Sequence, residues 1–229
     1  MPQMMAAVAM KVDVAPAMRS NAHVPPPDLW PRCAEMCTEQ GVKLIFDEIP
    51  SGLGKTGRFF AHEHFGVTPD IVVLGKALGG GVLPLAAVIG DESLNLAPEL
   101  AVGHYTHEKN PLLARAALAT LDVIEDGDLA AAAMDRGRQL ERLLDGREAG
   151  GRRLALRGLG LLRALSFDGA PAGEAVLEQL AREAGLSATA KDDRSIGVSL
   201  PLISSDEEIR MVANRLCHMA EVLSRADEC

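Results

Sequence analysis

Residues 43–81 constrain the fold most, because they hold two short apolar runs that each end at a chemically active side chain. The first run, 43–49, is rich in β-branched residues and ends in an acidic pair that begins with Asp47. The second, 71–74, is followed directly by Gly75 and Lys76. Continuous apolar runs of this length are typical of strands covered on both faces of a parallel or mixed sheet. An acid and an amine at neighbouring strand ends would face one crevice, where open α/β sheets bind ligands.

A carboxylate and a lysine in this arrangement have a specific chemical use. A lysine forms Schiff bases with carbonyl compounds, and pyridoxal phosphate needs such a lysine together with an acid against its ring nitrogen. Spacing alone favours a plainer interpretation, in which Asp47 caps a turn and Lys76 lies at the surface. Both interpretations stay open at this point.

Three segments of the chain carry a resemblance to a known family. They read LIFDEI, then GLGKTGRFFAHEHFGVTPDIVVLGKALGGGVLPLAAVIG, then THEKNPLLARAALATLDVIE. In order and in spacing, they resemble the class III (omega-type) pyridoxal-phosphate aminotransferases. The resemblance runs from about Val24 to the C-terminus and is strongest over 41–125. Because several motifs agree in register, it is more specific than a single glycine pattern.

The resemblance implies a cofactor, a set of site residues and a type of partner. Lys76 would form the Schiff base with pyridoxal phosphate, Asp47 would contact the pyridine nitrogen, and Ile49 would lie against the face of the ring. Thr106 would reach the cofactor phosphate of the neighbouring subunit in a homodimer. The reaction implied is transamination between a small-molecule amine and a keto-acid or aldehyde.

The chain also departs from the family pattern. The resemblance begins well inside the usual large domain, so we expect a chain truncated at its N-terminus that lacks much of the phosphate cup. Pro50 stands where many members carry a glutamine, and no arginine is present near Gly197 to Pro201, where many members bind a substrate carboxylate. Two alternatives to transamination therefore stay open. One is a pyridoxal-phosphate ammonia-lyase on an amino-phosphonate-like substrate, and the other is a non-catalytic fragment of the family.

A second motif, in residues 51–57, resembles a phosphate-binding loop but fails the test for one. A phosphate loop of the nucleotide hydrolases needs glycine five positions before Gly54, and that position is Ile49. We expect instead a mobile glycine-rich loop at the edge of the crevice. His62 and His64 follow the loop two residues apart, so they do not share a helix face, and we expect them to be structural or solvated.

The composition excludes several classes of protein. Apolar residues make up 48% and charged residues 24% of the 229-residue chain, as in globular proteins. The net charge of −9 and the 3% of aromatic residues argue against nucleic-acid binding and against an anionic membrane surface. Four cysteines without a metal-ligand pattern favour reduced thiols in a cytoplasmic protein, and no metal site is expected.

The pattern of the whole chain predicts an α/β fold. We expect a partial fold-type-I transferase with a mostly parallel sheet and flanking helices over residues 1–125, and a small α/β C-terminal domain over 126–229. The expected helices are 29–40, 58–65, 112–125, 128–144, 172–184 and 205–225. The expected strands or extended segments are 4–14, 43–49, 71–74, 86–90, 154–167 and 199–204.

Overall fold

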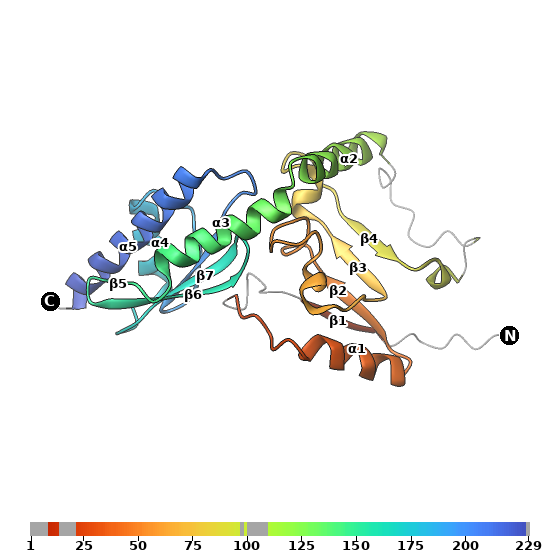
Figure 1. The fold of residues 1–229 in the computed structure, drawn as a ribbon, viewed down its shortest axis with the longest axis horizontal. Coiled ribbons are helices and arrows are strands. Elements are labelled where there is room, and N and C mark those ends of the chain that lie inside the picture. The colour runs from red at the N-terminus through yellow and green to blue at the C-terminus, as the bar shows by residue number, and fades with distance from the viewer. Residues whose placement is uncertain (1–8, 14–21, 97–98, 100–109, 228–229) are drawn as a thin grey trace.

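The computed structural model describes residues 9–13, 22–96, 99 and 110–227. These residues form two sheets at opposite ends of an elongated molecule, with α3 running between them (Figure 1). Each sheet has its own hydrophobic core. The chain is therefore an α/β protein with a mostly parallel first sheet and a C-terminal part of helices and strands, as the sequence predicts.

The first sheet has the strand order β1-β2-β3-β4. Its strands are β1 (Ala9–Asp13), β2 (Lys43–Asp47), β3 (Ile71–Leu74) and β4 (Ala87–Gly90). The first three run parallel, and β4 pairs with β3 in the antiparallel direction. Parallel strands are usually covered on both faces. In β2 and β3 every second residue is buried and the residues between them are half-buried, so one face is covered more fully than the other.

Helices and a loop cover the buried face of this sheet. Helix α1 (Leu29–Glu39) packs Trp30 against Phe46 of β2, with ring centroids 5.4 Å apart. Phe46 is in register with Val72 of β3, so both lie on this face, where Leu53 and the helix α2 (Pro111–Asp126) bury Val72 and Leu74. The side chain of Asn110 caps α2 by accepting the Leu112 amide at 2.9 Å, as expected for an Asn-Pro helix start.

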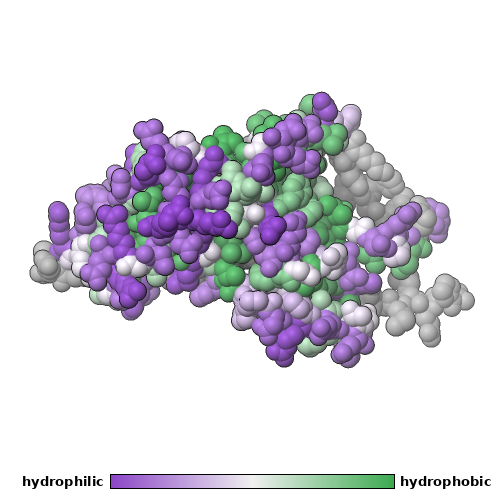
Figure 2. All heavy atoms as spheres, viewed as in Figure 1, coloured by the Kyte–Doolittle hydropathy of each residue, from purple (hydrophilic) through white to green (hydrophobic). Residues whose placement is uncertain are grey.

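The second sheet is antiparallel and has the order β5-β6-β7-β9-β8. Its strands are β5 (Glu148–Ala149), β6 (Arg152–Leu159), β7 (Leu162–Phe167), β8 (Ala190–Asp192) and β9 (Ser195–Ser199). Three helices, α3 (Leu129–Leu144), α4 (Glu174–Glu183) and α5 (Asp206–Asp227), bury one face of it in a single core. Figure 2 shows hydrophilic residues over much of this end, with hydrophobic residues reaching the surface mainly nearer the middle of the molecule.

Three short segments differ from the sequence prediction. An extended segment was expected at 199–204, but the strand in this part of the chain is Ser195–Ser199. It pairs with β8, a strand that the sequence did not predict. Serine and glycine in Ser195–Ser199 interrupt the apolar alternation that marks a strand. The turn between β8 and β9 is fixed by Asp192, whose carboxylate accepts the Arg194 amide at 2.9 Å. The helix expected at 58–65 is shorter, a 3₁₀ helix η1 (Ala61–Phe65).

Residues 51–57 join the two ends of the molecule. The Leu161 amide, in the turn between β6 and β7, donates to the Lys55 carbonyl at 3.0 Å. Gly160 lies so close that a Cβ on it would be 2.5 Å from the Thr56 carbonyl carbon. Gly57 likewise lies against Met134 of α3. The segment expected to be a mobile loop is thus packed and largely buried, because its glycines allow close approach of backbones.

Candidate functional site

The acid and the amine predicted from the sequence lie at the same edge of the first sheet. Asp47 is the last residue of β2 and pairs in register with Val73 of β3. Lys76 follows two residues after β3 ends, as the first residue of the 3₁₀ helix η2 (Lys76–Gly79). Because β2 and β3 are parallel neighbours, both residues stand at their carboxyl ends, where ligands bind in sheets of this kind.

The backbone at Lys76 is strained. Its φ is +47°, in the left-handed region that non-glycine residues rarely adopt. A residue held there costs about 1–2 kcal/mol and persists only where the surroundings impose it, which is common at functional sites. The Lys76 side chain is exposed, so its amine is accessible to a ligand.

Ile49 covers the backbone that leads into Lys76. Its Cγ1 and Cγ2 atoms would lie 3.5 and 3.6 Å from a Cβ placed on Gly75. These are ordinary van der Waals distances, so the Ile49 side chain lies directly beside Gly75. The apolar side chain predicted to face the cofactor ring is in contact with the residue next to Lys76.

A cavity of about 250 Å³ opens beside Lys76. Its walls come from the loop after β2, from η2 and from the segment after β9, so both ends of the molecule contribute. Among its lining residues are Ile49, Pro50, Lys55, Lys76, Pro201 and Leu202. The structure thus brings Lys76 and Ile49 into one apolar-walled space with a second lysine.

The other two predicted site residues are Asp47 and Thr106. Asp47 is outside the lining of this cavity, and its Oδ1 accepts the Ile49 amide at 3.1 Å, so it caps the turn after β2. That contact fits the plainer interpretation of Asp47, and a second role toward a ring nitrogen stays a prediction. Thr106 lies outside the described residues.

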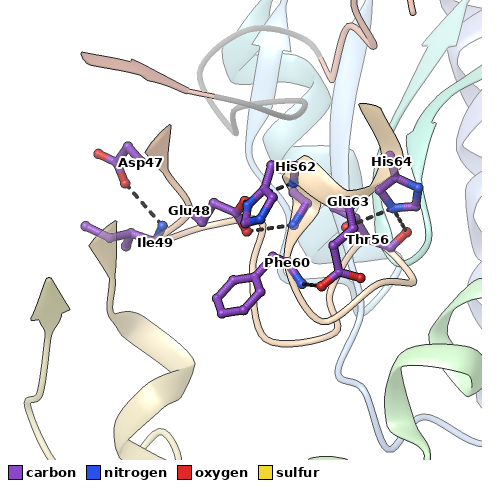
Figure 3. A network of polar contacts seen from close by, with 9 residues as sticks. Asp47, Glu48, Ile49, Thr56, Phe60, His62, Glu63 and His64 are labelled. Atoms are coloured by element: carbon purple, nitrogen blue, oxygen red, sulfur yellow. Dashed lines mark hydrogen bonds and ion pairs between the residues drawn. The ribbon is translucent and has the colours of Figure 1, made fainter. Parts of the chain in front are cut away.

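Glu48 is a structural residue of this region whose role the sequence did not indicate. Its side chain is buried, with 1% exposed area, and it points away from Asp47 into the loop that follows (Figure 3). Its carboxylate accepts the Ala61 amide at 2.6 Å and the His62 amide at 2.9 Å. The His62 ring, at Nδ1, completes the set at 2.7 Å. The acidic pair after β2 was the available signal, but only the fold shows which acid turns inward.

His62 and His64 are structural, as expected. His62 stacks on Phe60, with ring centroids 5.2 Å apart, and holds the Glu48 carboxylate. His64 lies with Nε2 at 3.1 Å from the Thr56 carbonyl oxygen. Burial disfavours its charged form and lowers the pKa of His64. Within the loop between β2 and β3, the His62 ring thus contacts the Glu48 side chain and the His64 ring contacts the Thr56 backbone (Figure 3).

Lys55 also has an environment that the sequence did not indicate. Its Nζ donates to the Leu200 carbonyl, across from the loop to the segment after β9. Desolvation by burial lowers the pKa of Lys55 to about 8. The contact joins residues far apart in the chain, so no local pattern could have predicted it.

Two classes of site are not found in the part of the chain that the structure describes. No group of three or more His, Cys, Asp or Glu side chains is placed to hold a metal ion there. Within the same residues, every helix is too short or too polar to cross a lipid bilayer.

Comparison with known proteins decides the family. The model of the family described as "Aminotransferase class-III" matches residues 20–220. The chain belongs to the class III aminotransferase family. Members of this family depend on pyridoxal phosphate, as the sequence resemblance implied.

Curated relatives show the range of chemistry in the family. The chain is 38% identical over 86% of its length to "(R)-1-hydroxy-2-aminoethylphosphonate ammonia-lyase" of Vibrio splendidus, matching 43% of that protein. It is 33% identical over 87% of its length to the ornithine aminotransferase of Saccharomyces cerevisiae, matching 49% of that protein. The chain thus spans about half the length of the curated relatives it matches.

Solved structures agree with the fold. The ornithine δ-aminotransferase of Plasmodium falciparum superposes with a TM-score of 0.84 at 26% identity, over 96% of this chain and 57% of that one. The ornithine aminotransferase of Toxoplasma gondii gives a TM-score of 0.83 at 29% identity, over 96% and 53% of the two chains. The fold is therefore a partial fold-type-I aminotransferase fold.

We predict that Glu48→Ala destabilises the protein far more than Glu63→Ala. Both carboxylates accept a backbone amide of the same loop, but Glu48 is buried while the Glu63 contact with the Phe60 amide, at 3.0 Å, is exposed. Losing the buried acceptor leaves two amides and a histidine without their partner, at a cost of about 3–5 kcal/mol. The exposed one should cost about 1 kcal/mol.

Urea denaturation of both variants, followed by circular dichroism, measures this difference. Equal losses of unfolding free energy in the two variants would show that the Glu48 contacts do not hold the loop.

Proposed function

We propose that this chain is part of a pyridoxal-phosphate-dependent aminotransferase in which Lys76 forms the Schiff base. The observation that carries the proposal is the accessible Lys76 amine at the carboxyl end of β3, in one cavity with Ile49, in a chain of the class III family. Residues 1–125 would form the cofactor part and residues 126–229 the small C-terminal domain. The substrates would be a small amine and a keto-acid or aldehyde.

The residues of the site fit this cofactor. A flat heterocycle needs an apolar surface and a reactive amine beside it, and Ile49 and Lys76, which line one cavity, would supply these. The carboxylate of Asp47, at the neighbouring strand end, would accept a hydrogen bond from the protonated ring nitrogen. Thr106 would hold the phosphate of the cofactor that is bound in the partner subunit of a homodimer. We propose the cytoplasm as the compartment of the protein.

Each residue has a task in transamination. Pyridoxal phosphate, when bound, supplies a ring that withdraws electrons from the substrate Cα. The Lys76 amine would hold the cofactor and, once a substrate amine had taken its place, would accept the proton from the substrate Cα and later return it. The Asp47 carboxylate would favour the protonated ring nitrogen, and Ile49 with Pro50 would keep water from one side of the site.

Addition of pyridoxal phosphate to the purified protein tests the assignment of Lys76. We expect a visible absorption band of a Schiff base, and borohydride should fix the pyridoxyl group to Lys76 in peptide mass spectra. Lys76→Ala should lose both signals. Lys43→Met is the matched control and should keep both signals. Lys43 lies at the other end of β2, where its Nζ is 2.8 Å from Oδ1 of Asp70. Trapping at another lysine, or equal trapping in Lys76→Ala, would contradict the assignment.

A second function uses the same residues. The similarity to the phosphonate ammonia-lyase, 38% identity over 86% of this chain, favours a lyase on an amino-phosphonate-like substrate as the alternative. The two reactions differ in their products. A lyase releases free ammonia without any keto-acid acceptor, whereas a transaminase transfers the amino group and needs one. Ammonia measured by glutamate dehydrogenase, with and without pyruvate, separates the two.

A further inference from the structure

The cavity beside Lys76 contains a second amine whose role the proposed function leaves open. Lys55 and Lys76 both line it, one from the loop after β2 and the other from the start of η2. Most of the remaining wall is apolar or backbone, and includes Ile49, Pro50 and Leu202. A cation surrounded by such a wall attracts an anionic group more strongly than one in water.

The Lys55 ammonium has hydrogen-bonding capacity to spare. An ammonium has three N–H donors, and the Leu200 carbonyl takes one of them. Among the described residues, no carboxylate pairs with it, and burial is the cause of its lowered pKa. With a pKa of about 8, Lys55 is still mostly charged at pH 7.

Lys55 is also held in place. Its backbone carbonyl accepts the Leu161 amide at 3.0 Å, and its side chain reaches the Leu200 carbonyl. Arg136 of α3 holds the next part of the same segment, through a 2.7 Å bond from Nη1 to the Leu202 carbonyl. Two cationic side chains thus fix residues 200–202 as one wall of the cavity, and only Lys55 of these two lines it.

We propose that Lys55 binds the anionic end of the substrate whose amine or carbonyl carbon reacts at Lys76. The anion is a carboxylate or a phosphonate, since both accept hydrogen bonds from an ammonium. Lys55 is then a specificity-determining residue, and it supplies the cation that the β9 segment, Gly197 to Pro201, does not carry. This inference rests on the proposed function of Lys76.

Reductive trapping with a matched set of aldehydes tests the proposal. The probes are succinic semialdehyde, phosphonoacetaldehyde and the neutral butanal, each with cyanoborohydride at pH 7. An aldehyde carbon condenses with the Lys76 amine, its oxygen leaves as water, and cyanoborohydride delivers hydride to the C=N bond. Peptide mass spectrometry then gives the fraction of Lys76 modified at each aldehyde concentration, and so the concentration at which labelling of Lys76 is half-maximal.

The wild type should reach half-saturation at Lys76 with at least one anionic aldehyde at a concentration about 10- to 100-fold lower than with butanal, as expected for a charge-assisted hydrogen bond. Lys55→Met should bring that ratio within about twofold. Lys55→Arg should keep the preference, and Lys43→Met should behave as the wild type. A preference for only one of the two anions identifies it as the substrate group.

Three results would overturn the proposal. They are equal half-saturation by all three aldehydes in the wild type, an unchanged preference in Lys55→Met, and adducts on Lys55 in place of Lys76. Should Lys55→Met fail to fold by circular dichroism, Lys55→Gln is a second neutral variant that can still donate to the Leu200 carbonyl. If butanal and the anions all leave Lys76 unmodified, the proposed function of Lys76 fails as well, whereas equal labelling of Lys76 removes only the role of Lys55.

Discussion

A buried carboxylate, that of Glu48, fixes the loop on which the candidate site depends. A charge taken out of water is tolerated only where donors surround it. Glu48 meets this condition with two backbone amides and the His62 ring, all within 2.9 Å. The backbone carbonyl of the same residue accepts the Gly52 amide at 2.9 Å. One residue therefore determines where the chain goes on leaving β2, and so where Ile49 and Lys55 lie.

The loop fixed in this way is also the contact between the two ends of the molecule. It packs against α3 through Gly57 and against the turn between β6 and β7 at Gly160, where the lack of a side chain lets the backbones approach closely. Arg163, which is buried, holds that turn by donating to the carbonyls of Gly158 and Gly160, at 2.9 Å each. The cavity beside Lys76 has walls from both ends, so its shape depends on this packing.

Sequence reasoning found what is encoded locally. Apolar runs that end at Asp47 and Lys76 predicted adjacent parallel strands, and the family resemblance rested on motifs that are contiguous in the chain. It missed what depends on distant contacts. Glu48 and Asp47 are adjacent acids, and only the packing of η1 decides which one is buried. Lys55 donates to the carbonyl of Leu200, 145 residues away, and no spacing pattern contains that contact.

Amide hydrogen exchange in the wild-type protein, measured residue by residue, tests the central claim most directly. That claim is that Glu48 makes the loop after β2 a fixed wall of the cavity. The amides of Ala61 and His62, which donate to the buried carboxylate, should exchange as slowly as the Glu48 amide, which donates to the Val73 carbonyl at 2.9 Å. The Phe60 amide, bonded to the exposed Glu63, should exchange much faster. Exchange of Ala61 and His62 at the rate of Phe60 would contradict the account.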